Sequence, residues 1–367
     1  MSRVWADINC DRWAANFRAI KEAVAPAVVV PVIKSDCYGL GAHRAATVFR
    51  QAGARRFAVA TLEEARALAD VGCELQILGA PMPEEISAMV KNDIVISVPD
   101  MSTARLIGNT AAKLGRIARV HVLIDSGMGR LGTLLPEALE TIRTVAALPY
   151  IDVEGVYSHL PAAEVNDAST HNQVEQMTTL MRDLTKQGVD IRYRHLANSS
   201  AAGGLPASAR EPFNMVRPGI DLHGAGSPDV MRSYHLEPVL TLKSRLAAVR
   251  RLPAGFTVGY GRTYKLTETQ LVGTIPVGYA DGYPYSLSNK GQVLIRGRRC
   301  PIIGSVCMDY SQVLLDDVPD AEVGDDVVLI GTQGKARITI QEVAETAGTI
   351  TYEILTGLGR RVERRYC

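Results

Sequence analysis

The chain lacks an excess of charge of either sign and lacks any long run of apolar residues. Its 367 residues include 40 Lys plus Arg and 39 Asp plus Glu, so no net electrostatic field attracts nucleic acid or an anionic membrane. The longest apolar runs, such as residues 27–33, are far shorter than the roughly 20 residues that span a bilayer. We therefore expect neither a nucleic-acid partner nor a membrane partner.

Paired cysteines are also missing. The six cysteines show no CxxC spacing and are Cys10, Cys37, Cys73, Cys300, Cys307 and Cys367. This scatter argues against a zinc site and against a disulfide framework. The first residues, MSRVWADINCDRW, carry early charges and no apolar segment of the kind found in a secretory signal. We expect a cytoplasmic protein without a metal site.

Short apolar runs alternate with amphipathic helical stretches from about residue 10 to residue 225. The runs lie around residues 28–34, 57–60, 75–79, 94–98, 118–124, 151–157, 192–196 and 214–220. They lack the alternation of half-buried strands, as expected for parallel strands that are buried on both faces. Eight such units favour an α/β fold with an N-terminal (β/α)8 TIM-like barrel. An open doubly wound sheet is the weaker alternative, because YGLGAH after the first run does not match GxGxxG.

Helix signals separate these runs. DRWAANFRAIKEAV places apolar residues at a period near 3.6, and TLEEARALADVG begins with a capping-box pattern of Thr61 and Glu64 and ends at Gly72. After about residue 235 the chain becomes β-rich and turn-punctuated, with one helical stretch, TIQEVAETAG. Because 367 residues exceed one small core, we predict two domains. These are a barrel over residues 1–235 and a smaller, mainly β domain over residues 236–367, with residues 1–9 as candidate members of the β domain.

Polar residues follow the predicted strands at the end where a TIM barrel carries its active site. Lys34 follows the first strand, where a lysine either extends to solvent and pairs with Asp36 or forms a Schiff base as a desolvated amine. Ser199 and the backbone of the PGI segment match the phosphate site expected after strands seven and eight. A lysine, a phosphate cradle and an arginine together suggest pyridoxal phosphate.

These segments also resemble the motifs of the alanine racemase family. Nine of them occur in the family's order: VIKSDCYGLGA, IDSGMGRLG, YSHL, ANSSA, VRPGI, GYGRTY, GYADGYP, GSVCMD and TYEIL. The resemblance covers essentially the whole chain, and nine motifs in order are highly specific. It implies a pyridoxal-phosphate-dependent racemase that interconverts L-alanine and D-alanine and supplies D-alanine for peptidoglycan.

The resemblance assigns roles to matching positions. Lys34 would hold the cofactor and act as one base, and Tyr260 would be the opposite base, contributed by the partner subunit of a homodimer with shared active sites. Arg130 and the backbone of Met308 would receive the substrate carboxylate. The remaining cofactor-binding positions are Tyr38, His159, Ser199, Arg217, Gly219, Ile220 and Tyr352.

Arg217 carries the most chemical information among these residues. It matches the arginine that faces the pyridine nitrogen, and an arginine cannot accept the proton that a carboxylate at this position would share. Return of the proton to the α-carbon is then favoured over transamination. We predict that His195 supports the site by hydrogen bonding rather than by carrying a proton.

Three positions depart from the commonest family pattern. Many members have a lysine, carbamylated in the folded enzyme, two residues before the aspartate of the DTGMGR motif, and Leu123 stands there. Ser305 replaces the arginine of GRVCMD, and Gly259 precedes YGRTY where serine is frequent. The first two alter the charge of the pocket, so a broader-specificity racemase or a serine racemase remains an alternative.

Two further alternatives are weaker. A barrel-type decarboxylase would set an acidic residue at the pyridine nitrogen, where this chain has Arg217. A non-catalytic carrier of pyridoxal phosphate would lack the second domain and the opposing Tyr260.

Overall fold

The computed structural model describes residues 2–165 and 167–367, which form two compact units. One unit contains Arg12–Cys37 and Gly41–Glu237, and the other contains the described residues up to Asp11, Tyr38–Leu40 and Pro238–Cys367. We call them the barrel unit and the β unit. The chain passes from the first to the second between Glu237 and Pro238, whereas the sequence predicts this boundary between residues 235 and 236.

The barrel unit is built around eight parallel strands. They are β2 (Val28–Val29), β3 (Arg56–Val59), β4 (Glu74–Ile77), β5 (Ile96–Val98), β6 (Ala118–Asp125), β8 (Ile151–Tyr157), β9 (Tyr193–His195) and β10 (Met215–Val216). Hydrogen-bonded pairs join them in the order β2-β10-β9-β8-β6-β5 and β3-β4. Single bridges, Val32 with Ala58 and Gln76 with Val95, close the ring. All eight predicted strand positions and the (β/α)8 barrel are confirmed.

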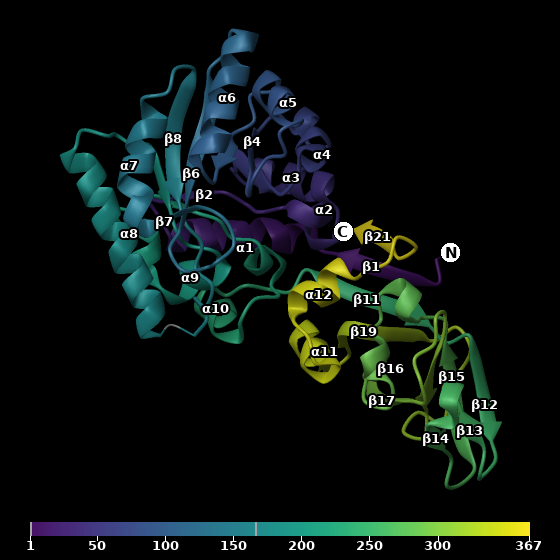
Figure 1. The fold of residues 1–367 in the computed structure, drawn as a ribbon. Helices are drawn as coiled ribbons and strands as arrows, with labels where there is room; N and C mark the ends of the chain where they lie inside the picture. The colour runs from purple at the N-terminus through teal and green to yellow at the C-terminus, as the bar shows by residue number, and fades with distance from the viewer. Residues whose placement is uncertain (1, 166) are drawn as a thin grey trace. The chain divides into compact units, whose positions relative to one another are not determined.

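Helices lie outside the barrel strands, as Figure 1 shows for α3 to α8 around β4, β6 and β8. Their bounds are α1 (Cys10–Ala23), α3 (Ala42–Gln51), α4 (Leu62–Arg66), α5 (Ile86–Lys91), α6 (Met101–Leu114), α7 (Leu135–Ala146), α8 (Ala168–Lys186), α9 (Ser199–Gly204) and α10 (Pro228–Ser233). The apolar face of α1 buries Trp13 and Phe17 against Phe49 of α3, with ring centroids 6.0 and 5.9 Å from Phe49. Burial of such aromatic faces fixes the helices on the barrel.

The helix predicted from residue 61 to residue 72 forms in two pieces. Thr61 caps α4 by accepting a hydrogen bond from the Glu64 amide, and a separate 3-10 turn, Ala69–Val71, ends at the left-handed Gly72. The Glu64 carboxylate does not complete a capping box on Thr61. It accepts from the amides of Ala60 and Ser35, at 2.8 and 2.6 Å. Glu64 therefore ties α4 to the segment that follows Lys34.

The β unit is mainly antiparallel. Its sheet runs in the order β12-β15-β18-β17-β16-β19-β11-β1-β21, with β20 beside β19. The strands are β1 (Val4–Ile8), β11 (Leu240–Arg245), β12 (Ala248–Leu252), β15 (Gln270–Ile275), β16 (Gln292–Ile295), β17 (Arg298–Ile303), β18 (Ser311–Leu314), β19 (Asp326–Gln333), β20 (Ala336–Ile338) and β21 (Glu363–Tyr366). A ribbon of β13 (Thr257–Val258) and β14 (Tyr264–Lys265) and the helices α11 (Ile340–Ala347) and α12 (Thr351–Thr356) complete the unit.

Strand β1 belongs to this sheet because it pairs antiparallel with β11 and parallel with β21. One face of the sheet covers a cluster of Leu252, Val258, Leu266, Val272 and Ile303. The single predicted helical stretch forms α11, which Thr339 caps and Gly348 ends in the left-handed conformation. Val258 and Leu266 of the buried cluster lie on either side of the segment that carries Tyr260 and anchor it.

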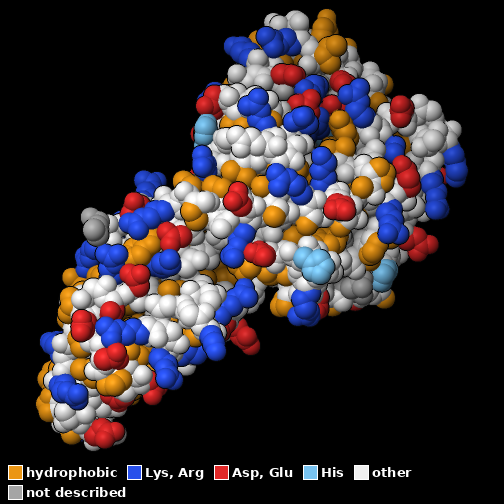
Figure 2. All heavy atoms as spheres, turned by 180° about the vertical axis from the view of Figure 1, so that it is seen from behind, with side chains coloured by type: hydrophobic (Ala, Val, Ile, Leu, Met, Phe, Trp, Pro, Cys, Tyr) orange, Lys and Arg blue, Asp and Glu red, His pale blue; other side chains and the backbone are white. Residues whose placement is uncertain are grey.

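The surface carries charges of both signs. Figure 2 shows Lys and Arg side chains interspersed with Asp and Glu on the displayed face, in keeping with their nearly equal numbers. Within the described residues, no helix is long and apolar enough to cross a membrane.

Candidate active site

Lys34 begins an unusual turn at the end of the first barrel strand. Residues Lys34–Tyr38 form α2, in which Ser35, Asp36 and Cys37 have φ values of 52°, 52° and 53°. This is the left-handed region, which non-glycine residues rarely occupy and which costs roughly 1–2 kcal/mol per residue. Hydrogen bonds hold the turn: Cys37 N donates to Ile33 O, and the Asp36 carboxylate accepts from the amide of residue 42.

The Lys34 side chain reaches the rim of the barrel and is exposed there. Partial burial, and then the positive charge of Arg130, lower the pKa of the Lys34 amine, while Glu64 opposes the shift. Lowering the pKa increases the fraction of neutral amine, which is the nucleophilic and basic form. Lys34 is thus activated by its surroundings without being enclosed.

Arg130 lies in a loop that Asp125 organises. The Asp125 carboxylate accepts backbone hydrogen bonds from Gly127, Met128, Gly129 and Arg130, at 2.8 to 3.1 Å. Burial works to raise the pKa of Asp125, but these four bonds together hold it below its ordinary value. The loop needs a glycine at Gly132, where φ is 118° and a Cβ would lie 2.8 Å from the Asp125 amide.

The Arg130 side chain itself is exposed and makes no hydrogen bond or ion pair with any residue that the structure describes. Leu123, where the common family pattern has lysine, is buried on β6 and offers no acceptor. The guanidinium is therefore available to an anion at the rim.

His159 lies among three cations. Burial first, and then the charges of Arg217, Arg130 and Lys34, lower the pKa of His159 to about 3. His159 is consequently neutral at physiological pH. The charges of all three cations therefore act on His159 within the barrel unit.

Arg217 follows β10 and is almost fully buried. Its Nη2 donates to the carbonyls of Ser158 and Leu196, at 2.8 and 3.2 Å, and its Nη1 donates to His195 Nδ1 at 2.6 Å. The guanidinium also lies 5.3 Å from the centre of the Tyr157 ring. Burial lowers the pKa of Arg217 to about 10, so it remains charged at neutral pH.

Ser199 and Gly219 meet beside this arginine. The Gly219 amide donates to Ser199 Oγ at 2.9 Å; Ser199 begins α9 after β9, and Gly219 precedes the 3-10 turn after β10. Ile220 follows directly and begins a 3-10 turn, Ile220–His223. A hydroxyl and successive backbone amides form the donor set that a phosphate group requires.

The β unit carries the remaining predicted site residues in two groups. Tyr38 and Tyr352 lie with ring centroids 5.9 Å apart. The segment between Tyr38 and Leu40 approaches α12 so closely that a Cβ on Gly39 would lie 2.7 Å from the Leu355 carbonyl. Arg364 donates to the Gly39 carbonyl at 3.0 and 3.1 Å, which fixes this approach.

The second group surrounds Tyr260, whose side chain is 77% exposed. Ser305 Oγ donates to the Tyr260 carbonyl at 2.9 Å, and Gly259, with φ of 73°, lies against the backbone of Ser305. Met308, 53% exposed, lies on the next loop, where Arg361 forms ion pairs with Asp281 and Asp309, both at 2.7 Å. Ser305, which replaces the family arginine, therefore supports the Tyr260 loop.

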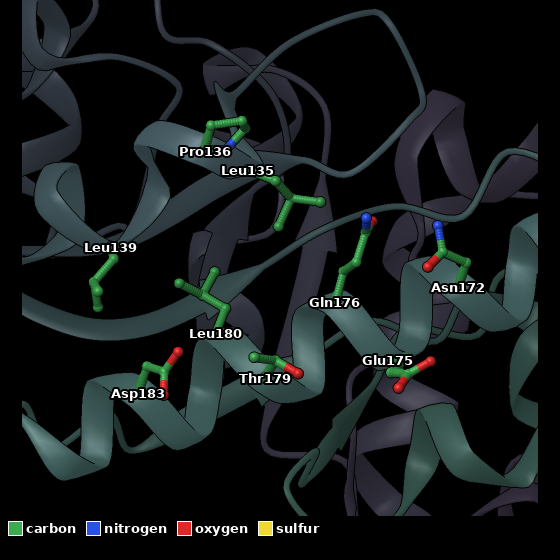
Figure 3. Close-up of a pocket in the computed structure, with 9 residues that line it drawn as sticks. All are labelled: Leu135, Pro136, Leu139, Asn172, Glu175, Gln176, Thr179, Leu180 and Asp183. Atoms are coloured by element: carbon green, nitrogen blue, oxygen red, sulfur yellow. The ribbon is translucent and has the colours of Figure 1, made fainter.

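A surface pocket of about 560 Å³ lies elsewhere on the barrel unit, between α7 and α8 (Figure 3). Leu135, Leu139 and Leu180 line it together with Glu175 and Asp183. None of the site residues predicted from the sequence lines this pocket, and its lining contains no lysine, arginine or histidine. It therefore offers neither an amine for a Schiff base nor a cation for a phosphate or a carboxylate.

The structure thus gathers Lys34, Arg130, His159 and Arg217 in the barrel unit, and it gathers Tyr260 and Met308 in the β unit.

Two supporting residues do not emerge from the sequence motifs. The capping-box pattern predicts only a helix cap at Glu64, yet its carboxylate holds the segment after Lys34. His121 is a lone histidine in the apolar stretch ARVHVLID and belongs to none of the nine motifs. A polar residue at a buried strand position is the signal that could have found His121.

Comparisons with known proteins cover the same two units. The family description "Alanine racemase, N-terminal domain" matches residues 8–227, and "Alanine racemase, C-terminal domain" matches residues 239–366. An alanine racemase of Carboxydothermus hydrogenoformans is 41% identical over 371 residues, covering 100% of both chains.

Solved structures agree with these matches. An alanine racemase of Streptomyces lavendulae has a TM-score of 0.92 at 32% identity, covering 100% of this chain and 97% of the other. An alanine racemase of Bartonella henselae, solved with covalently bound pyridoxal phosphate, has a TM-score of 0.90 at 28% identity, covering 100% of both chains.

Proposed function

The chain belongs to the alanine racemase family, a family of pyridoxal-phosphate-dependent isomerases, and we propose that Lys34 and Tyr260 are its two catalytic bases. On this proposal the two residues act on opposite faces of the substrate α-carbon and interconvert L-alanine and D-alanine. The D-alanine formed supplies peptidoglycan synthesis. The observation that supports the assignment is the lowered pKa of the exposed Lys34 amine, on which Arg130 acts, beside His159, on which Lys34, Arg130 and Arg217 all act.

The residues present fit the cofactor. Lys34 offers an amine of lowered pKa for covalent attachment. The Ser199 hydroxyl and the Ile220 amide offer donors to a phosphate, and the Gly219 amide can join them by exchanging its bond to Ser199 Oγ for one to the phosphate. Tyr38 and Tyr352 are proposed as further phosphate ligands, and His159 as the residue beside the pyridine ring. When bound, pyridoxal phosphate supplies a conjugated ring that accepts the electrons left on the α-carbon after its proton is removed.

Arg217 sets how strongly that ring withdraws electrons. Three of its five N–H donors are committed to His195, Ser158 and Leu196, which leaves two for an acceptor at the rim. A guanidinium can only donate, so Arg217 placed against the ring nitrogen would leave that nitrogen unprotonated. Electron withdrawal by the ring is then limited, and rapid return of a proton to the α-carbon is favoured over transamination.

Lys34 and Tyr260 provide the proton transfers on this proposal. The Lys34 Nζ removes or returns the α-proton on one face, and the Tyr260 hydroxyl does so on the other. Arg130 donates to the substrate carboxylate, and the backbone of Met308 assists it. This pairing holds the α-carbon between the two bases during each turnover.

The exposure of Tyr260 supports a homodimer with shared sites. Its hydroxyl makes no hydrogen bond within the described residues, and Met308, Tyr279 and Tyr285 nearby also expose large areas. Aromatic residues and methionine are enriched at interfaces between subunits. We propose that this surface of the β unit covers the barrel rim of a second copy.

A broader-specificity racemase, including one that accepts serine, is the second candidate. Leu123 and Ser305 replace charged residues of the common pattern, and both are buried, so the pocket differs in charge from that pattern. The two candidates share the reaction and differ only in the amino acid.

Two measurements test the proposal. Borohydride reduction of the purified holoenzyme followed by peptide mapping should place a pyridoxyl group on Lys34, and modification of a different lysine would refute the assignment. Chirally resolved product analysis with L- and D-forms of alanine and serine should show the highest kcat/KM for alanine. A preference for serine would select the second candidate, and no change of chirality in any substrate would refute a racemase.

A further inference from the structure

Arg217 is the first member of a chain of buried polar side chains that runs through the barrel interior. Its Nη1 contacts His195 Nδ1 at 2.6 Å, and His195 Nε2 contacts His121 Nδ1 at 2.7 Å. His121 Nε2 lies 3.5 Å from Glu154 Oε2, and Arg56 donates to the same carboxylate oxygen at 3.0 Å. Both histidines are 0% exposed, and Glu154 and Arg56 are buried as well.

The donor-only character of Arg217 fixes the direction of every hydrogen bond in this chain. Because the guanidinium must donate, His195 accepts at Nδ1 and carries its proton on Nε2. His195 Nε2–H then donates to His121 Nδ1, so His121 carries its proton on Nε2. That proton points toward the Glu154 carboxylate, which accepts it. The chain therefore begins at a cation, ends at an anion and passes through two neutral imidazoles.

Neighbouring groups agree with these tautomers. Gln76 Nε2 is 3.1 Å from His121 Nδ1 and can only donate to it. Burial first, with a hydrogen bond to Glu154 opposing, lowers the pKa of His121 to about 4, and burial lowers the pKa of His195 well below its ordinary value. Both histidines are therefore neutral at pH 7, with one ring proton each. Arg56 Nη1 also lies 3.4 Å from His121 Nε2, but the two donors at Nδ1 leave the His121 proton on Nε2, and a guanidinium cannot accept it. Glu154 Oε2, at 3.5 Å, is therefore its acceptor, and Arg56 donates to the carboxylates of Glu74 and Glu154.

The surrounding side chains hold the rings in place. Tyr157 stacks on His195 with centroids 4.8 Å apart and ring planes 2° from parallel, and its hydroxyl contacts Ser97 Oγ at 2.7 Å. Gly155, opposite His121 on the neighbouring strand, leaves room for the imidazole, because a Cβ there would lie 2.6 Å from the His121 ring. The barrel interior is therefore shaped around the chain.

We propose that His195, His121 and Glu154 are positioning residues that hold Arg217 in one orientation as a hydrogen-bond donor and transmit the charge of Glu154 to it. The proposal rests on the proposed function, in which Arg217 faces the ring nitrogen of the cofactor. A carboxylate in direct contact would neutralise Arg217. Two neutral imidazoles turn a hydrogen-bond acceptor toward Arg217 without bringing a carboxylate into contact with it, so Arg217 keeps its charge and its remaining N–H groups for the ring.

The histidine tautomers can be measured in the wild-type apoenzyme, without the cofactor. In protein labelled with 15N-histidine, NMR should show His195 and His121 with a proton on Nε2, a bare Nδ1 and no titration between pH 6 and pH 8. The exposed His235 provides an internal reference resonance outside the barrel interior. A proton on Nδ1 of His195, or an imidazolium at either position, would overturn the proposal.

Transmission of charge is tested with Glu154→Gln and a matched control, Glu74→Gln. Glu74 pairs with the same two arginines as Glu154, at 2.6 Å from Arg56 and 3.2 Å from Arg119, but is not part of the chain. In Glu154→Gln the Nδ1 resonance of His195 should shift, although His195 does not touch Glu154. The control should leave that resonance in place. Equal shifts, or no shift, in the two variants would contradict transmission through the chain.

The same variants, loaded with cofactor, give a spectroscopic readout. The absorbance maximum of the bound cofactor should move in Glu154→Gln and stay fixed in Glu74→Gln, because only the first changes the donor at the ring nitrogen. A merely structural role would lower stability without this selective shift. If Glu154→Gln does not fold, the wild-type tautomers alone decide. If NMR shows the expected tautomers while borohydride labels another lysine, the assignment of Lys34 in the proposed function is refuted, but the hydrogen-bonded series from Arg217 to Glu154 is still supported.

Discussion

The two units carry their candidate catalytic residues in opposite physical settings. In the barrel unit Arg217 is buried, donates to three acceptors and leads into a hydrogen-bonded interior. In the β unit Tyr260 is 77% exposed, and its carbonyl accepts a hydrogen bond from Ser305. Hydrogen bonds within the barrel unit thus fix Arg217, whereas the β unit fixes only the backbone of Tyr260 and leaves its side chain exposed. The proposed function accordingly places electronic control of the cofactor in the buried interior and the second base on an exposed surface.

Removal of Lys34 should have the largest effect, because it takes both the covalent anchor and one base from the barrel half. We expect Lys34→Ala to lose more activity than the roughly 10²–10⁴-fold that the loss of one acid–base group costs. Racemisation assays with circular dichroism measure the loss, and an Arg66→Ala variant on the exposed part of α4 serves as a control. Residual activity above one tenth of wild type would remove Lys34 from the mechanism.

Tyr260→Phe should impair the proton transfer assigned to the β unit and spare the one assigned to Lys34. We expect loss of solvent-proton exchange on one enantiomer by roughly 10²–10⁴-fold, with a far smaller loss on the other, because Lys34 still serves one face. Mass spectrometry of L- and D-alanine incubated in deuterated water measures both rates. Equal losses for the two enantiomers would contradict a two-base mechanism.

Acid should destabilise the barrel half through its buried histidines. The pKa of His121 is lowered to about 4 and that of His223 to about 3, both first by burial, and the pKa of His195 is also lowered. Between pH 6.5 and these pKa values, the three histidines bind protons in the unfolded protein but remain neutral in the folded protein. The free energy of unfolding should therefore fall as pH decreases below 6.5, by at most about 1.4 kcal/mol per pH unit for each histidine.

Urea unfolding of the apoenzyme between pH 7.5 and pH 5 measures this slope. Glu154 adds nothing in that window: burial opposes its ionisation, but its bond to His121 and nearby arginines lower its pKa to about 2, so its stabilisation is lost only below about pH 4.5. A free energy of unfolding that does not change from pH 7.5 to pH 5 would show that these histidines are not held neutral.

The smallest effect concerns Leu123. Since leucine cannot form a carbamate, we expect removal of CO₂ and restoration of bicarbonate to leave the activity unchanged. Small anions should raise KM more than they lower kcat, because the Arg130 side chain is exposed and makes no hydrogen bond among the described residues. Initial rates in degassed and bicarbonate-supplemented buffer provide the comparison. Activity that depends on bicarbonate would require a carbamylated lysine elsewhere.

The strands and the rim residues could be predicted from the sequence, because buried parallel strands appear as apolar runs and active-site residues follow them. The left-handed turn from Ser35 to Tyr38 could not, since nothing in SDCY marks four successive non-glycine residues with positive φ. Contacts with Glu64, 29 residues away, help to stabilise that turn. The hydrogen-bonded series from Arg217 to Glu154 could not be predicted either. Its members lie on or beside four different strands, and only the register of those strands in the closed barrel brings them together.

Subunit complementation tests the two-part site most directly. On the proposed assignment Lys34→Ala lacks the barrel-unit base and Tyr260→Phe lacks the β-unit base, so each variant alone should be nearly inactive. If each site combines the barrel unit of one subunit with the β unit of its partner, mixed dimers contain one intact site, and activity should reappear after the variants are mixed under conditions that exchange subunits. No recovery, with exchange demonstrated by mass-labelled subunits, would show that each site is built from a single chain and would contradict the account.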